Sequence, residues 1–206
     1  SLIIVNEQGV PEFIQMIGAS EPILPEEIQE EYLQKTRHLH MSGINLEALK
    51  HASKIARDSG VPVSLDSGRK KSELGLKKLK PILKNVDTLI INRHEAKVLL
   101  GLEDQAKVLD VAKRLRKRIG KDKTYVIKGG KENIVVLSPN GDFLVPSFKV
   151  EVKDTIGAGD AFDAGFLAAM LRGKTLEDAA VYGAACGSLK CTREGAQSAP
   201  DKSTLE

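Results

Sequence analysis

The stretch Asp154-Thr-Ile-Gly-Ala-Gly-Asp160-Ala-Phe162 lies between a strand-like run, Phe148 to Val152, and a long apolar helix predicted over Ala161 to Leu171. Two glycines and an alanine leave the backbone bare where that helix begins. Free amide N–H groups and the positive end of the helix dipole meet there, so we expect this turn to hold an anion such as a phosphoryl group in transfer. A carboxylate at Asp160 would repel that anion unless it accepts a proton from an attacking hydroxyl, and this combination favours a kinase.

A simpler interpretation is a tight turn in which Asp160 is only a helix N-cap or a first-turn acid. The longer string, however, resembles the C-terminal signature of the ribokinase (PfkB) family of sugar and nucleoside kinases. The resemblance implies Asp160 as catalytic base, the amides of Gly157, Ala158 and Gly159 as the anion hole, and Thr155 as a nucleotide contact. It also implies an α/β fold with a doubly wound, mostly parallel sheet and a small β lid.

The length, composition and charge of the chain limit the classes of protein to which it can belong. With 206 residues and 41% hydrophobic content, the chain can bury one substantial core. No run approaches about 20 uninterrupted apolar residues and no signal peptide is visible, so we expect no membrane partner. The well-mixed net charge of +3 argues against a nucleic-acid partner. Cys186 and Cys191 are expected to be buried thiols of a reduced, cytoplasmic protein.

The beginning of the chain predicts a hairpin, with strands at Leu2 to Val5 and Pro11 to Met16. In the family a sheet of this kind forms a lid over the sugar. Ile14, Met16 and Ile17 would then face the substrate or a partner subunit, giving a homodimer through the lid. An edge hairpin that serves only the core is the alternative.

Two domains follow from the resemblance: residues 1–22 as part of the lid, and residues 23–206 as the ribokinase-like nucleotide-binding core. The matched pattern covers only the later two thirds of the family, without the opening βα units that carry most sugar contacts. We therefore expect about 80 to 100 further residues before Ser1 in the natural protein.

From residue 37 onward, strands and helices alternate. Strands are predicted at His38–Met41, Val61–Leu65, Thr88–Ile91, Thr124–Ile127, Ile134–Leu137 and Phe143–Pro146. Helices are predicted at Glu26–Lys35, Leu46–Ser59, Leu74–Lys84, His94–Leu100, Gln105–Ile119 and Leu176–Lys190. This alternation indicates parallel βαβ units, whose ligands gather beyond the carboxyl ends of the strands.

Polar residues follow two of these strands. Asp66-Ser-Gly-Arg69 brings an acid and a guanidinium out of the sheet together, either near the sugar or its phosphate or as a structural turn. Asn92-Arg-His-Glu95 matches the family's Asn-x-x-Glu motif. An amide and a carboxylate suffice for Mg²⁺, which keeps several waters, although Asn92 and Glu95 also have the spacing of a helix capping box. We expect Asn92 and Glu95 to hold Mg²⁺ and the triphosphate.

A glycine-rich turn, Lys128-Gly129-Gly130, follows the next strand, where the family contacts ATP. The family often has a second glycine where this chain has Glu132 or Asn133. Asparagine tolerates a left-handed backbone, so we expect the turn to survive.

The segment after the last long helix resembles the family's monovalent-cation loop. The resemblance implies a potassium ion ringed by carbonyls near Lys190, Arg193 and Gly195, together with Asp154 and Ile156. Only the carbonyls of the two basic residues could serve as ligands.

The motifs together predict an ATP-dependent sugar kinase that uses Mg²⁺. A nucleoside kinase or a 2-keto-3-deoxygluconate kinase uses the same chemistry, and a non-catalytic nucleotide-binding regulator remains the alternative from another class. His38 and His40 alternate on one strand and should share a face, but a zinc site there lacks a third ligand.

Overall fold

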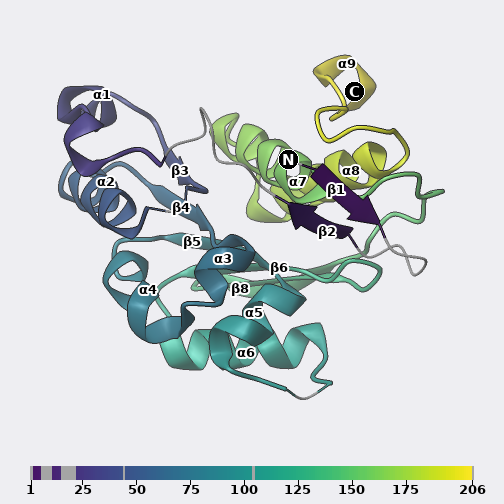
Figure 1. The fold of residues 1–206 in the computed structure, drawn as a ribbon, viewed down its shortest axis with the longest axis horizontal. Helices are drawn as coiled ribbons and strands as arrows, with labels where there is room; N and C mark the ends of the chain where they lie inside the picture. The colour runs from purple at the N-terminus through teal and green to yellow at the C-terminus, as the bar shows by residue number, and fades with distance from the viewer. Residues whose placement is uncertain (1, 6–10, 15–21, 44, 104, 206) are drawn as a thin grey trace.

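The fold is that of a computed structural model, which describes residues 2–5, 11–14, 22–43, 45–103 and 105–205 (Figure 1). The predicted lid residues Met16 and Ile17 lie outside these ranges. Two sheets are present in the described chain: a two-stranded ribbon near the N-terminus and a six-stranded sheet.

The large sheet has the strand order β3-β4-β5-β6-β7-β8. Its strands are β3 (Leu39–Met41), β4 (Val63–Asp66), β5 (Thr88–Asn92), β6 (Thr124–Lys128), β7 (Ile134–Ser138) and β8 (Gly141–Val145). The first three pairings are parallel and the last two are antiparallel. The mostly parallel α/β sheet is thus confirmed. Its central strands are continuous apolar runs because both of their faces are buried.

Helices cover both faces of this sheet (Figure 1). One face carries α1 (Glu30–Gln34), α2 (Leu46–Asp58), α4 (Gly75–Leu83), α5 (Arg93–Leu100) and α6 (Val108–Ile119). The other face carries α7 (Ala158–Leu171) and α8 (Leu176–Cys191). Short helices add η1 (Pro25–Glu27), α3 (Gly68–Ser72) and α9 (Lys202–Leu205).

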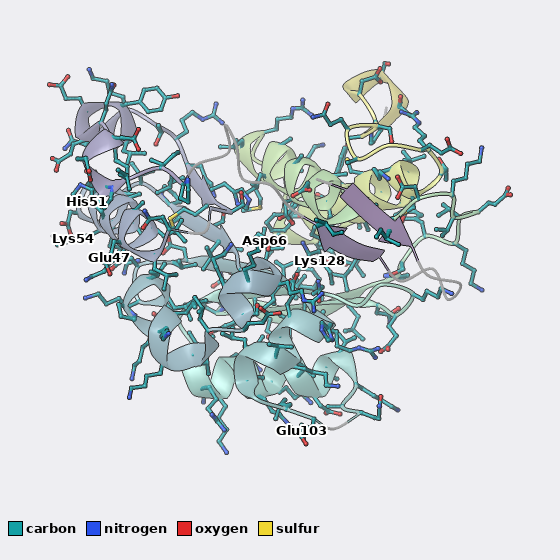
Figure 2. All side chains as sticks on the ribbon, viewed as in Figure 1. Glu47, His51, Lys54, Asp66, Glu103 and Lys128 are labelled. Carbon is teal, nitrogen blue, oxygen red and sulfur yellow. The ribbon has the colours of Figure 1, made fainter. Side chains whose placement is uncertain are left out.

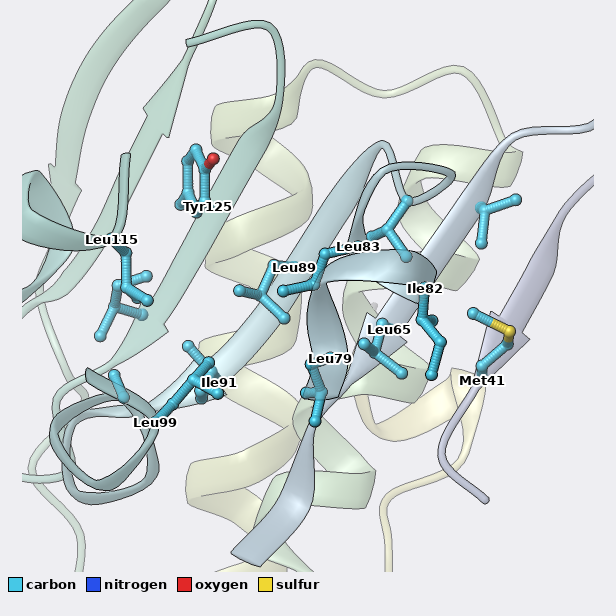
Figure 3. Close-up of a cluster of buried hydrophobic side chains, with 14 of the residues drawn as sticks. Met41, Leu65, Leu79, Ile82, Leu83, Leu89, Ile91, Leu99, Leu115 and Tyr125 are labelled. Carbon is cyan, nitrogen blue, oxygen red and sulfur yellow. The ribbon is translucent and has the colours of Figure 1, made fainter. Parts of the chain in front are cut away.

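Two hydrophobic cores result from the alternation of side chains along the strands. On β5, Leu89 and Ile91 point into the core beneath α2, α4, α5 and α6, while Ile90 joins the core beneath α7 and α8. Figure 3 shows the first core, in which Leu89, Ile91 and Tyr125 from the strands meet Leu79 and Leu99 from the helices. The two cores fix the sheet between its helical layers, and so fix the strand ends.

Close packing of α7 on α8 depends on glycine. A Cβ placed on Gly165 would overlap the side chain of Cys186, and one on Gly183 would lie 3.0 Å from the Phe162 ring. The glycines of α7 and α8 therefore let the backbones of the two helices approach each other closely. This contact holds the start of α7 in place.

Several predicted elements differ from the structure. The helix expected over Glu26–Lys35 is split into η1 and α1, because Ile28 and Gln29 are extended. The strand expected at Phe148–Val152 is wrong: this segment pairs with no strand in the described chain, and both end residues are half exposed. The turn after Asp66 forms the short helix α3, and α7 begins three residues earlier than predicted, at Ala158.

The N-terminal ribbon is an antiparallel pair, β1 (Leu2–Val5) with β2 (Pro11–Ile14), as predicted. Leu2 pairs with Ile14 and Ile4 with Glu12, so Ile4 and Ile14 share one face of the ribbon. Their side chains are 51% and 56% exposed. Across the described chain, no helix is both long and apolar enough to span a bilayer.

Candidate functional site

The polar residues of the predicted site gather at the carboxyl ends of the parallel strands. Asp66 ends β4, Asn92 ends β5 and Lys128 ends β6. Asn92 is the register partner of Lys128. Figure 2 labels Asp66 and Lys128 close together near the middle of the molecule. Strand ends that are far apart in the sequence therefore meet at one edge, next to the beginning of α7.

The turn that begins α7 presents free amides, as predicted. Gly157 is the N-cap residue and has a left-handed backbone (φ 82°), and a Cβ at this position would collide with the carbonyl of Ala196. One predicted anion-hole amide is already engaged, since Ala158 N donates to the carbonyl of Thr155 at 3.1 Å. Within the described chain, the amides of Gly157, Gly159 and Asp160 donate to no protein acceptor. Three amides of this turn are therefore free to bind an anion, and that of Ala158, which was predicted to take part, is not.

Asp160 lies in the first turn of α7 and is exposed. The interpretation as an N-cap is wrong, because Gly157 occupies that position and no side chain caps the helix. Asp160 is instead a carboxylate in the first turn of the helix, next to free amides. Burial lowers the pKa of His40, and the charge of Asp160 is a minor contribution that opposes this shift.

Lys128 connects this turn to the sheet. Its Nζ lies 3.0 Å from Asp66 Oδ2 and 3.1 Å from Asp163 Oδ1, and its side chain is only 13% exposed. A Cβ built on Gly159 would lie 3.4 Å from the same Nζ. The ammonium is therefore a fixed positive charge beside the anion-hole amides.

Asp163 was missed by the sequence analysis. It is a buried carboxyl one turn after Asp160, and a charge within the apolar run Ala161–Leu171 was the available signal. Burial raises the pKa of Asp163 to about 8; the Lys128 ammonium opposes this shift, and a hydrogen bond with Asp66 adds to it. The pKa of Asp66 stays below its usual value: burial opposes this, but the Lys128 ammonium and hydrogen bonds from Asp163, Lys128 and Gly68 outweigh it. The pKa values of the two carboxyls beside Lys128 are thus shifted in opposite directions.

Asp66 and Arg69, which were expected to leave the sheet edge together, point to different partners. Asp66 Oδ1 accepts from Gly68 N at 2.7 Å, whereas Arg69 Nε donates to Glu73 at 3.0 Å on an exposed face of α3. The helical turn points the arginine away from the strand end. Lys71, which the sequence analysis did not single out, is buried instead and donates to the carbonyl of Ser42 at 2.9 Å. Burial lowers the pKa of Lys71, against the pull of Asp66 and Glu95.

Asn92 and Glu95 form a reciprocal capping box at the start of α5. Asn92 Oδ1 accepts from Glu95 N at 2.9 Å, and Glu95 Oε2 accepts from Asn92 N at 3.2 Å. The box fixes the Glu95 carboxylate at the sheet edge and leaves its other oxygen, Oε1, outside the box. Burial raises the pKa of Glu95, with the Asp66 charge adding to the shift. A cation would relieve this crowding of acids.

The glycine turn after β6 survives as predicted, but not by the expected means. Gly130 supplies the left-handed residue (φ 68°), and no residue other than glycine has a positive φ in the described chain. A Cβ on Gly129 would collide with the carbonyl of Asn133, so the turn is tight at that position. Arg93 forms an ion pair with Glu132, which ties this turn to the Asn92–Glu95 motif.

His38 and His40 share a face, as predicted. Both rings contact the buried Ser64 hydroxyl, His38 through Nε2 and His40 through Nδ1, each at 2.8 Å. His40 Nε2 lies 3.9 Å from Asp163 Oδ2. In the described ranges, no three His, Cys, Asp or Glu side chains form a group that could hold a metal ion. The pair therefore extends the polar network behind Asp163.

The residues of the expected potassium loop lie close together, and the Lys190 side chain binds one of them, Asp154. Lys190 Nζ donates to the carbonyl of Asp154 at 2.9 Å and lies 3.2 Å from Asp154 Oδ2. Gly195 N and Ile156 N donate to the same carboxylate, at 3.0 and 2.9 Å. These residues do not fit a potassium ion, because an ammonium already binds the oxygens of Asp154.

The chain is similar to known proteins in sequence and in fold. A family model described as pfkB family carbohydrate kinase matches residues 1–203. The chain is 33% identical over 198 residues to an ATP-dependent ribose-1-phosphate kinase of Halopiger xanaduensis, covering 96% of this chain and 63% of the relative. It therefore spans less than two thirds of that protein's length.

Solved structures show the same fold. Ribokinase from Thermotoga maritima superposes with a TM-score of 0.82 at 25% identity, covering 98% of this chain and 66% of that chain. A putative ribokinase II from E. coli, solved in complex with ATP and Mg²⁺, superposes with a TM-score of 0.69 at 26% identity, covering 84% of this chain and 57% of that one.

Proposed function

Because the chain belongs to the pfkB family of carbohydrate kinases, we propose that it transfers the γ-phosphoryl group of ATP to a sugar hydroxyl, with Asp160 as general base. One observation carries the proposal. Asp160 is an exposed carboxylate in the first turn of α7, among three free amides, and a Cβ on the preceding Gly159 would lie 3.4 Å from Lys128 Nζ. A base, an anion hole and a fixed positive charge at one strand edge are the groups that phosphoryl transfer needs.

The roles of the other residues follow from their charges. The amides of Gly157, Gly159 and Asp160 would bind the oxygens of the phosphoryl group, and Lys128 would stabilise the charge that develops on it. The turn at Gly129 and Gly130 and the neighbouring Thr155 would contact the nucleotide. Mg²⁺, bound with ATP, would neutralise phosphate charge, and Glu95 with Asn92 would hold it, directly or through water. Potassium is not included, because Lys190 binds Asp154.

The acceptor in this proposal is a sugar or a sugar phosphate. The relative at 33% identity is named for ribose 1-phosphate, so pentose phosphates are tested first. Ribose, 2-keto-3-deoxygluconate and nucleosides follow, because the same base and anion hole would serve any of these hydroxyls.

The division of the chain is also a proposal. Residues 1–22 would form part of a lid over the sugar, and residues 23–206 the nucleotide-binding core. The exposed Ile4 and Ile14 on one face of the ribbon support a homodimer through the lid. A monomeric mass by light scattering at micromolar concentration would contradict the dimer. The free thiols of Cys186 and Cys191 support a cytoplasmic location.

The deciding experiment measures ADP release from ATP with each candidate acceptor, for the wild type and two variants. Asp160→Asn keeps the shape of the side chain and should slow turnover at least ~10²-fold, the usual scale of a positioned general base, while ATP still binds. Asp178→Asn is the matched control, because Asp178 is an exposed acid in the first turn of α8. Equal turnover in the two variants would return Asp160 to a helix-start role, and ATP binding without turnover on any acceptor would favour a regulator.

A further inference from the structure

Lys190 lies behind the turn that begins α7. It is in the last turn of α8, and its side chain is completely buried. A buried ammonium is costly unless it is paired and hydrogen-bonded. Here both needs are met by one residue, since Lys190 Nζ contacts the carbonyl and the carboxylate of Asp154.

The other bonds of Asp154 complete a closed arrangement. Its Oδ1 accepts from Ile156 N and its Oδ2 from Gly195 N, while its own N–H donates to the carbonyl of Cys191 at 3.2 Å. Each oxygen of Asp154 therefore has a donor already. The pKa of Asp154 is held below its usual value by the Ile156 amide first and by Lys190 and Gly195 as well, so the carboxylate stays charged.

Two of the carbonyls expected to ligate potassium, those of Lys190 and Gly195, also have donors. The carbonyl of Lys190 accepts from Arg193 N at 3.0 Å, and that of Gly195 accepts from Ser198 N at 3.2 Å and Ser198 Oγ at 2.7 Å. A potassium ion needs several oxygens that replace its hydration shell. An ion against Asp154 would compete with these donors and would lie beside the like charge of Lys190.

We propose that the Lys190 ammonium is a built-in monovalent cation that replaces potassium in this chain. It binds the first residue of the turn, and the turn is locked to the following loop because Gly157 packs against the carbonyl of Ala196. Lys190 thereby holds the amides of Gly157, Gly159 and Asp160 toward the phosphoryl group. It is a positioning residue, and this part of its role rests on the proposed kinase function.

The consequence is a protein whose stability and activity do not depend on the monovalent cation in solution. Thermal midpoint, ATP–Mg²⁺ affinity and turnover of the wild type should be the same in potassium, sodium and choline chloride at matched ionic strength. Lys190→Ala removes the ammonium and leaves space, so it should lower the thermal midpoint and reduce turnover by about 10- to 100-fold. Potassium or ammonium ions, but not choline, should restore part of both losses.

Lys123→Ala is the matched control. Lys123 is also a buried lysine that donates to a carbonyl, that of Val86 at 2.8 Å, but it lies away from the turn. It should lower the thermal midpoint without any dependence on the cation. If Lys190→Ala does not fold in choline, folding that returns only with potassium or ammonium supports the proposal.

Three results would overturn the proposal. The first is a wild-type turnover at least about fivefold faster in potassium than in choline, and the second is a wild-type thermal midpoint that rises with potassium. The third is a Lys190→Ala variant whose thermal midpoint and turnover are the same in potassium, ammonium and choline. The thermal midpoint needs no substrate. Absence of turnover in every salt would therefore count against the kinase function, while the midpoints still decide the role of Lys190.

Discussion

Two buried lysines contact the two ends of the segment Asp154–Asp163, and they differ in what surrounds them. Lys190 is fully buried and has one carboxylate partner, Asp154, whose pKa stays below its usual value. Lys128 keeps 13% of its side chain exposed and is shared by Asp66 and Asp163, with the pKa of Asp163 raised to about 8. One ammonium paired with one carboxylate, as in Lys190 and Asp154, is typical of a structural ion pair. One lysine with two carboxyls, one of which has a strongly raised pKa, is typical of a functional site that binds another charged group.

The largest expected effect comes from Lys128→Met. Turnover should fall by about 10²- to 10³-fold, the scale of removing a donor that stabilises developing charge. Stability should fall less than the ~3–5 kcal/mol typical of breaking a buried pair, because Asp163 can keep its proton and remain neutral. Urea unfolding of Lys128→Met and Lys190→Met at pH 7 tests this. A greater loss of stability in Lys128→Met than in Lys190→Met would reverse the comparison.

Gly157→Ala breaks the link between the turn and the loop that follows α8. It adds a Cβ at a left-handed backbone and against the carbonyl of Ala196, so we expect a loss of about 2–4 kcal/mol and lower turnover. Gly173→Ala is the control, since Gly173 has a similar φ (75°) but nothing within 4 Å of its Cβ position. It should cost only about 1–2 kcal/mol. Equal losses, measured by thermal unfolding, would mean that the loop contact contributes nothing.

The raised pKa of Asp163 predicts a pH dependence of stability. Only the folded state keeps the Asp163 proton between its usual pKa of 3.8 and about 8, so this carboxyl lowers the free energy of unfolding as pH rises through that window. This slope of the free energy of unfolding is up to about 1 kcal/mol per pH unit, and Asp163→Asn should remove it.

The difference between wild type and Asp163→Asn isolates this effect. His38 and His40, whose pKa values are lowered by burial, contribute the opposite slope below about pH 6.5 in both proteins. The lowered pKa of Asp66 acts below pH 3.8, and the raised pKa of Lys128 acts above its usual 10.5. Parallel pH profiles for the two proteins would contradict the raised pKa of Asp163.

The smallest expected effect is that of Arg69→Ala. Its ion pair with Glu73 is exposed, so stability should change by no more than about 0.5 kcal/mol and turnover should not change. Lys71→Met, on the same short helix, provides the contrast because Lys71 is buried beside Asp66, and it should be clearly less stable. A large effect of Arg69→Ala on turnover would restore Arg69 to the site.

Much of the fold could be predicted from local patterns. Apolar runs marked the strands of the large sheet, and amphipathic or small-residue patterns marked most of the long helices, to within a few residues. One error arose because a strand also needs a hydrogen-bonded neighbour. Phe148–Val152 has the composition of a strand but pairs with no strand in the described chain. A strand forms only where its backbone groups find partners, and the composition of a segment does not reveal them.

By itself, the sequence determined the order of elements, the family and the residues of the turn Asp154–Asp160, because each depends on neighbours within a few positions. Only the tertiary structure decided which charges meet. Lys128 pairs with Asp66 across 62 residues, and Lys190 with Asp154 across 36. A potassium ion was expected against Asp154, yet the Lys190 side chain binds the carbonyl and carboxylate of this residue. Burial and charge balance are set by distant segments brought together, and these decide whether a lysine is a solvated surface charge, a phosphoryl ligand or an internal cation.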